Sequence, residues 1–387
     1  MGPSISDGRY RHSFVSLGAL KPRTLTLALL FAATLLAQSS ITLQSPVEYQ
    51  VFQRQSRTSG TIWVAGHAGV DGDAIEARAS GDWQPIPFDR GSRVFRGPLP
   101  AAAGGWYEFG LRLRKSGQTV AEMRIPHVGI GEVFVIAGQS NSTNYGEVKQ
   151  RTRTGMVAAL GPNGWALADD PQPGVQDSSR NGSFIPPFGD ALFEKYRIPI
   201  GVAAAGHGST SVRQWLPEGE RFERQPTMTK FVHPAPGGGW ESDGTLFDGM
   251  MKVVRQFGPQ GFRALLWHQG ESDANQQPGH EISGGDYARL LTRLIDASHR
   301  QAGWDFPWFV AQASYHSPAD TGSAEIRDAQ ESLWKSGIAL EGPDTDQLAG
   351  DNRQNGGRGV HFTDKGLQAH GRLWAAKVGA YLDSVLK

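Results

Sequence analysis

A serine at position 140 follows an apolar run, residues 133–137, inside the segment Gly-Gln-Ser-Asn at 138–141. Such a run is typical of a buried parallel strand, and in open α/β sheets reactive groups gather beyond the carboxyl ends of the strands. A serine hydroxyl becomes a good nucleophile once a neighbouring base takes its proton. Ser140 is therefore the candidate nucleophile.

Eleven histidines compete for the role of that base. His361 is preferred because it lies late in the chain, just before an expected helix, where a loop can return over the carboxyl edge of a sheet. His207 and His268 are its rivals, since each directly follows an apolar run. A histidine picked at random is more often a structural residue, so the choice depends on position and on neighbouring motifs.

Acyl transfer also needs hydrogen-bond donors where negative charge develops. The Ser140 amide is one candidate. Glycines in the turn at 206–211 let the backbone approach a ligand closely, which makes the Gly208 amide the second. The side-chain amide of Gln269, just after the apolar run at 264–267, is the third. These groups together indicate a serine esterase.

The elements that must position these residues follow from the apolar pattern beyond residue 129, where strands alternate with helices. The predicted strands are 133–137, 200–205, 264–267 and 308–311, and the predicted helices surround 246–257 and 287–295. A last helix begins at Thr363 as its N-cap. Its inward side chains are Leu367, Trp374, Val378, Leu382 and Val385.

Ahead of this region, apolar and polar residues alternate in short runs, which predicts antiparallel strands. In the segment 106–114, one face carries Tyr107, Phe109, Leu111 and Leu113. The fold class is therefore α/β, with a small antiparallel β-sandwich before the main domain. We divide the chain into a signal peptide at 1–39, the sandwich at 40–128 and the α/β hydrolase domain at 129–387.

The first 39 residues have the pattern of a secretion signal. Lys21 and Arg23 precede an apolar stretch at 25–36 that is short for a membrane span, and small residues follow at 37–39. The prediction is a secreted or periplasmic protein with no stable membrane insertion after cleavage. An uncleaved anchor and a misplaced start codon are the alternatives.

Charge and composition limit the partners. The 387 residues include 38 basic and 38 acidic side chains without long runs of one sign, so no nucleic-acid partner is indicated. The 50 glycines and 23 prolines indicate many turns within a globular chain, and its length predicts two domains. Because the chain has no cysteine, disulfides do not contribute to the fold.

Three segments together resemble the SGNH hydrolase superfamily, in its branch of sialate O-acetylesterases and acetylxylan esterases of carbohydrate esterase family six. Residues 138–141 match its Gly-Gln-Ser-Asn block, 208–211 resemble its Gly-Gly-Thr-Ser block, and 267–271 match its Trp-His-Gln-Gly-Glu block. The resemblance spans about residue 129 to the C-terminus. It implies a three-layer α/β/α, flavodoxin-like fold and a deacetylase without a metal or organic cofactor.

The resemblance also implies residue roles. Ser140 is the nucleophile and His361 the base, while the oxyanion donors are the amides of Ser140 and Gly208 and the side chain of Gln269. Two further residues, Arg213 and Trp215, are expected to bind substrate at the rim of the site. A surface cation and a packing aromatic are the alternatives for this pair.

Two positions depart from the family pattern. Arg358 stands three residues before His361, where the family has the aspartate that orients the histidine. Glu271 is the first replacement for this acid, and the other candidates are a backbone carbonyl, Asp273 and Asp351. Ser209 replaces the second glycine of its block, which narrows the space beside the oxyanion.

The sequence thus predicts an exported carbohydrate O-acetylesterase that acts through an acetyl-enzyme on an acetylated carbohydrate. Acetylated xylan, sialic acid and other acetylated polysaccharides all remain candidate substrates. The expected specificity loops are 143–150, 233–240 and 275–285. The alternatives are a general short-chain carboxylesterase and a non-catalytic carbohydrate-binding protein.

Overall fold

The computed structural model describes residues 40–386, and the predicted signal peptide at 1–39 lies outside this range. The residues Ser39–Lys387 form one compact unit. Within the described part of the chain, no helix has both the length and the apolar character that crossing a membrane requires.

One strand, β9 (Gln118–Gly138), organises the fold, and its carboxyl half pairs in parallel with a strand on each side. The sheet runs in the order β11-β10-β12-β9-β16-β17-β18. Its other strands are β10 (Val157–Gly161), β11 (Gly164–Leu167), β12 (Ile200–Ala204), β16 (Ala264–His268), β17 (Trp308–Gln312) and β18 (Leu340–Asp344). The four predicted strands are confirmed as β9, β12, β16 and β17.

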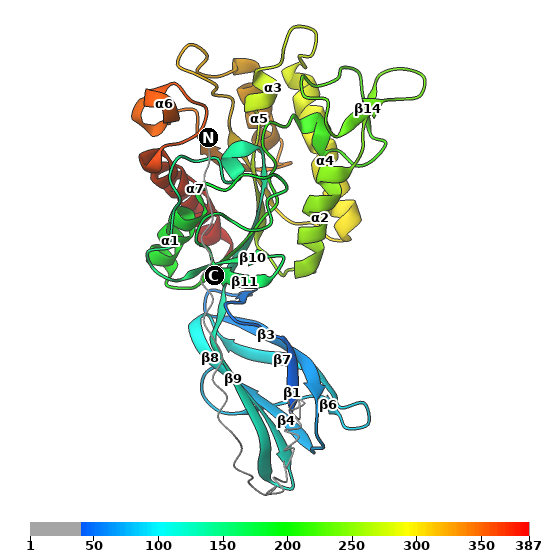
Figure 1. Ribbon diagram of the computed structural model, residues 1–387, viewed down its shortest axis with the longest axis vertical. Helices are drawn as coiled ribbons and strands as arrows, with labels where there is room; N and C mark the ends of the chain where they lie inside the picture. Colours follow the sequence, from blue (N-terminus) through cyan, green and yellow to red (C-terminus); the bar gives the residue numbers. More distant parts are fainter. Residues whose placement is uncertain (1–39, 387) are drawn as a thin grey trace, which may run out of the picture. The chain divides into compact units, whose positions relative to one another are not determined.

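Helices cover both faces of this sheet (Figure 1). One face carries α2 (Thr245–Phe257), α4 (Gly284–Ala302) and α5 (Ala324–Lys335), and the other carries α1 (Ile185–Tyr196) and α7 (Asp364–Val385). Successive β9 side chains alternate between the two cores: Val133 and Val135 pack in the first, Phe134 and Ile136 in the second. The predicted three-layer α/β/α architecture is confirmed.

The last helix begins as predicted, with the Thr363 hydroxyl accepting a hydrogen bond from the Gly366 amide. Four of its five predicted inward residues are buried: Leu367, Trp374, Val378 and Leu382. The prediction for Val385 is wrong, because this residue ends the helix and is 43% exposed, while Leu386 fills the core there.

Two antiparallel sheets pack face to face at the other end of β9, as the sequence predicted. The first contains β1 (Ile41–Ser45), β3 (Ser59–Ala68), β7 (Val94–Ala102) and β6 (Phe88–Asp89). The second contains β4 (Ala74–Arg78), β5 (Gln84–Ile86), β8 (Gly104–Lys115) and the amino half of β9. Of the predicted inward face of β8, Tyr107 is only partly buried, while the buried members are Phe109, Leu111 and Leu113.

The sandwich and the α/β region share β9, which crosses the division predicted at residue 129 without interruption. A short strand, β2 (Val51–Gln53), pairs with β9 at this crossing. Next to it, the fully buried Glu132 carboxylate pairs with Arg54 at 2.6 Å and with Arg263 at 2.7 Å. The exact domain boundary stays a prediction.

The strand order explains where a site can form. After β9 the chain forms β10, β11 and β12 on one side of it and then β16, β17 and β18 on the other, so the strand order reverses at β9. In doubly wound sheets, ligands bind beyond the carboxyl ends of the strands at such a reversal. The short elements near this edge are η1 (Ser140–Ser142), η2 (Val212–Trp215), α3 (Glu271–Ala274), η3 (Gly350–Asn352), α6 (Gln354–Gly357) and the small sheet of β13 (Arg221–Phe222), β15 (Trp240–Ser242) and β14 (Val232–Pro234).

Candidate active site

A sharp turn at the end of β9 positions Ser140. Gly138 has a φ of +124°, and a Cβ at this residue would lie 2.1 Å from the carbonyl oxygen of His268 on the paired strand. Only glycine fits there without displacing the backbone. The Gln139 amide then donates to the same carbonyl at 2.8 Å, and Ser140 begins η1 just beyond the sheet edge.

Ser140, Glu271 and His361 line one pocket with a volume of about 230 Å³. Most of the other lining residues have polar side chains. They are Gln139, Ser209, Ser211, Gln214, Thr227, Ser272, Asn275, Gln276 and His316, together with Pro226, Met228 and Val360. Among the predicted specificity loops, only 275–285 contributes to it. The segment 226–228 was not predicted because no apolar period or turn motif marks it.

His361 stacks on the ring of Tyr145, with ring centroids 5.0 Å apart and planes 25° from parallel. In the residues that the structure describes, no carboxylate lies within ion-pair distance of its ring. Burial, and then the positive charge of Arg353, lower the pKa of His361 to about 4. The imidazole is therefore neutral at pH 7, which is the state that a general base requires.

The peptide before His361 is held in place by two side chains for which no role was predicted from the sequence. The Val360 carbonyl accepts hydrogen bonds from Arg353 Nη1 at 2.5 Å and from Asn141 Nδ2 at 3.3 Å. Arg353 is 2% exposed, and its guanidinium lies over the Phe362 ring, 4.1 Å from the centroid. No sequence signal marked Arg353, which lies in an irregular stretch between β18 and α7.

Glu271 is nearly buried at the first position of α3. Its Oε1 accepts a hydrogen bond from Asn141 Nδ2 at 2.8 Å and lies 3.6 Å from His268 Nδ1. Its Oε2 is buried without a hydrogen-bond partner in the described residues. Glu271 therefore reaches His361 only indirectly, through Asn141 and the Val360 carbonyl.

The other candidate acids do not contact the His361 ring. Asp273 is buried and accepts hydrogen bonds from Ser211 Oγ at 2.6 Å and the Val212 amide at 2.8 Å, which fastens η2. The Asp351 side chain is 89% exposed and pairs with Lys365. Arg358, which replaces the expected aspartate, is also exposed and donates to the Asn355 carbonyl.

The two rival histidines lie outside the pocket lining. Nδ1 of His207 lies 2.8 Å from the Gly208 carbonyl, and its ring meets Phe231 edge-on. His268 is 1% exposed, and its Nε2 lies 2.9 Å from Thr345 Oγ1. Burial lowers the pKa of His268, so it is a neutral core histidine.

The Gly208 amide, predicted as an oxyanion donor, donates instead to Asp177 Oδ2 at 2.7 Å. A Cβ on Gly208 would lie 2.8 Å from the Tyr145 ring, so this glycine makes room for the ring that stacks on His361. The next residue, Ser209, lines the pocket with φ +59°. Across the described chain, its amide has no hydrogen-bond partner.

The Gln269 side chain is also engaged away from the pocket. It is fully buried, and its Nε2 donates to the Thr210 carbonyl at 3.0 Å and to Asp273 at 2.7 Å. Its Oε1 accepts from the Tyr287 hydroxyl at 3.0 Å. The structure does not bring Gln269 to the pocket wall, and its contacts join η2 to the loop after β16.

The expectation that Arg213 and Trp215 line the rim is not met, because both side chains are fully buried. Nε of Arg213 donates to Ser211 Oγ at 2.9 Å, and Nε1 of Trp215 donates to Thr210 Oγ1 at 2.9 Å. Trp215 also packs edge-on against Trp267. Ser211 caps the start of η2, and within this short helix the Arg213 and Trp215 side chains are buried.

The pocket thus combines a serine at a strand end, a neutral histidine and an unpaired backbone amide, which is a set suited to acyl transfer. In residues 40–386, no group of three or more His, Cys, Asp or Glu side chains has an arrangement that could hold a metal ion.

Comparison with known proteins adds independent findings. A family model described as a carbohydrate esterase, sialic acid-specific acetylesterase, matches residues 130–379. A carbohydrate acetylesterase from Xanthomonas citri has a similar structure, with a TM-score of 0.54 and 16% identity, over 87% of this chain and 74% of that one. A protein from Arabidopsis thaliana gives a TM-score of 0.44 at 18% identity, over 65% and 98%. No curated protein sequence matches.

Proposed function

The chain belongs to the family of carbohydrate esterases described as sialic acid-specific acetylesterases, and from this premise we propose that it deacetylates a carbohydrate through a serine acetyl-enzyme. Membership confirms the resemblance stated from the sequence. The observation that carries the proposal is that Ser140 and a neutral His361 line the same small pocket.

The proposed reaction has two halves. The Ser140 hydroxyl attacks the acetyl carbonyl while His361 takes its proton. The tetrahedral intermediate then expels the sugar oxygen, which receives that proton from His361, and leaves acetyl-Ser140. Water attacks the acetyl group with His361 again as base, and acetate departs as Ser140 regains its proton.

We assign the oxyanion donors to the amides of Ser140 and Ser209. The Ser209 amide replaces that of Gly208 in this assignment, since Asp177 already accepts the Gly208 hydrogen bond. Gln269 is likewise replaced, because both hydrogens of its Nε2 have acceptors in the core. Two preorganised donors fit the usual construction of such a site.

Glu271 serves in this proposal as a positioning residue. Its carboxylate holds Asn141, which in turn holds the Val360 carbonyl beside His361. Stacking on Tyr145 fixes the plane of the imidazole. The chemistry is thus carried by Ser140 and His361, without a carboxylate on the histidine ring.

The size of the pocket favours a small acyl group. A volume of about 230 Å³ lies below the roughly 300–1,000 Å³ of typical drug-sized ligand sites. Serine, threonine, asparagine and glutamine side chains line it beside Pro226, Met228 and Val360. We therefore propose an acetyl ester on a sugar hydroxyl as the substrate, and a steep loss of rate from acetate to octanoate among nitrophenyl esters.

We also propose that the protein is exported, and that its carbohydrate substrate lies in the periplasm or outside the cell. The support is the pattern of residues 21–39, where two basic side chains precede a short apolar stretch and small residues. N-terminal sequencing of the secreted protein, with a start near residue 40, is the corresponding test.

Acetate release from nitrophenyl acetate and acetylated xylan tests the esterase proposal. Ser140→Ala and His361→Ala should each lower kcat by about three orders of magnitude or more. Glu271→Gln should lower it less, since Glu271 acts through Asn141. Ser332→Ala, on α5 and outside the pocket, is the matched control and should keep the wild-type rate. A wild-type protein that releases no acetate from any acetylated carbohydrate would contradict the proposal.

A further inference from the structure

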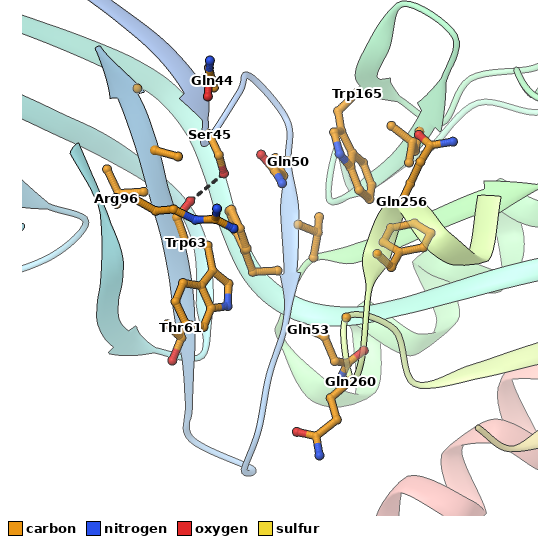
Figure 2. A pocket seen from close by; sticks show the side chains of 18 of the residues that line it. Gln44, Ser45, Gln50, Gln53, Thr61, Trp63, Arg96, Trp165, Gln256 and Gln260 are labelled. Atoms are coloured by element: carbon orange, nitrogen blue, oxygen red, sulfur yellow. Dashed lines mark hydrogen bonds between the residues drawn. The ribbon is translucent and has the colours of Figure 1, made fainter. Parts of the chain in front are cut away.

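A second and larger hollow lies far from Ser140, between the sandwich and the α/β region. It has a volume of about 820 Å³. We call it the junction groove: one wall comes from β1, β3 and β7, and the other from β11, the end of α2 and the loop 258–261 (Figure 2). Both walls belong to one compact unit and are joined by β2 and the Arg54–Glu132 ion pair.

The junction groove is separate from the proposed catalytic pocket. The loop 258–261 precedes β16 at its amino end, whereas the pocket lies beyond His268, at the carboxyl end of the same strand. At about 3.3 Å per residue, β16 alone separates the two by roughly 13 Å. No residue lines both.

An exposed tryptophan stands on the sandwich wall. Trp63 is 55% exposed on the outward face of β3, where Thr61 and Ala65 share its side. Figure 2 shows Trp63 and Trp165 on opposite walls of the groove. Trp165 lies close against the backbone because its neighbour Gly201 has no Cβ, which would fall 2.9 Å from the indole ring. Flat aromatic faces of this kind pack against the C–H faces of sugar rings.

Polar side chains with unused hydrogen-bonding groups surround the two indoles. Over the described part of the chain, the side chains of Gln44, Arg96 and Gln260 make no hydrogen bond or ion pair. Gln50 and Gln55 use only their oxygens, which accept from the Val47 amide and the Thr61 hydroxyl. The groove therefore offers several free amide donors to a ligand.

The charge of the groove limits the ligand further. Arg96 is the one charged residue among those that line it, and no Asp or Glu belongs to the lining. A cation would find no carboxylate there, and a polyanion would find a single positive charge. Hydroxyl groups, which both donate and accept hydrogen bonds, match amides and indole N–H groups best.

We propose that the junction groove is a second carbohydrate site, which binds a neutral stretch of a polysaccharide with a sugar ring stacked on Trp63. This inference rests on the proposed function for the identity of the polymer, although binding in the groove requires no reaction at Ser140. A chain held in the groove raises the local concentration of its acetylated units near the enzyme. The groove then lowers the KM for polymer and leaves small esters unaffected.

Affinity electrophoresis tests this proposal independently of turnover. The Ser140→Ala protein is run through gels that contain xylan, glucomannan or polygalacturonate. We expect retardation by at least one of the two neutral polymers. In that background, Trp63→Ala should weaken retention about tenfold or more, while Trp63→Phe should retain part of it.

Val120→Ala is the matched control, since Val120 is a 43% exposed apolar residue on β9 outside the groove. It should bind like the parent. Trp63→Ala in the otherwise wild-type enzyme should hydrolyse nitrophenyl acetate at the normal rate, which also verifies folding, and should show a raised KM for acetylated polymer.

Several outcomes would overturn the groove proposal: no retention by either neutral polymer, retention by polygalacturonate alone, or retention unchanged by Trp63→Ala. Failure of the esterase proposal is recognised separately, because it would appear as missing acetate release by the wild-type protein. The two failures therefore cannot be confused.

Discussion

The residue that most distinguishes this site is His361, the proposed base, whose ring has no carboxylate partner in the described chain. In a triad, the acid fixes the tautomer and supports the imidazolium that forms during the reaction. Here, stacking on the Tyr145 ring and the two hydrogen bonds to the Val360 carbonyl orient the imidazole. They provide no negative charge to stabilise an imidazolium. Because burial and Arg353 both act against the charged form, His361 is protonated only in acid.

The pH profile of kcat/KM reports this directly. In the proposed mechanism, activity needs neutral His361, so kcat/KM should stay constant from pH 7 to about pH 5 and fall through a midpoint near the pKa of about 4. An ordinary histidine would place the midpoint near pH 6.5. The rate on nitrophenyl acetate is the measurement, with circular dichroism at each pH to separate titration from unfolding. A midpoint near 6.5 would show that Arg353 and burial do not act on His361.

The Asn141 side chain connects the Glu271 carboxylate to the Val360 carbonyl. In Asn141→Ala, the buried Glu271 loses its hydrogen bond and the Val360 carbonyl loses one of its two donors. We expect a loss of about 1–3 kcal/mol in the free energy of unfolding and about tenfold or more in kcat/KM. Urea unfolding and steady-state kinetics measure the two. Wild-type values for both would rule out a positioning role.

The position of some site residues could be predicted from the sequence, and that of others could not. Ser140 and His361 line one pocket, as predicted, because topology constrains both a residue at a strand end and a residue just before the last helix. Topology does not constrain the direction of a side chain in this way, so the burial of Arg213 and Trp215 could not be predicted from the sequence. The hydrogen bond that the Gly208 amide donates to Asp177 could not be predicted either, because Asp177 lies in an irregular segment without a periodic pattern.

At the scale of elements, short turns at the ends of strands position the residues of the site. The turn after β12 places Gly208 against Tyr145, and the turn after β9 places Ser140 in the pocket wall. The sequence located β9, β12, β16 and β17 because continuous apolar runs mark buried parallel strands. It missed β18, whose residues include Gly342 and Pro343, which strands disfavour.

The turn after β12 can be tested with Gly208→Ala. The added Cβ would meet the Tyr145 ring at 2.8 Å, displace it and disturb the stacking on His361. We expect kcat on nitrophenyl acetate to fall about tenfold or more, since a small misplacement of a catalytic group is costly. Gly285→Ala is the control, because a Cβ there makes only an ordinary contact in α4. Equal kinetics in the two variants would refute this role for Gly208.

For the whole molecule, β9 is the strand that the sandwich and the α/β sheet share. The ion pairs of Glu132 with Arg54 and Arg263 lie where β9 passes from one to the other. Removing one partner of a buried ion pair leaves an uncompensated charge. Glu132→Ala should therefore lower the free energy of unfolding by about 3–5 kcal/mol, measured by urea titration. Lys335→Ala, which breaks the exposed pair with Glu331, should change it by less than about 1 kcal/mol. Similar losses in both variants would exclude a special role for the junction.

The central claim is that Ser140, activated by His361, is the nucleophile of this esterase. Its most direct test is covalent labelling with an organophosphate such as diethyl nitrophenyl phosphate, followed by peptide mass spectrometry. We expect a single diethylphosphoryl group on the peptide that contains Ser140, slower labelling in His361→Ala and none in Ser140→Ala. An active protein that labels at another serine, or not at all, would contradict the claim.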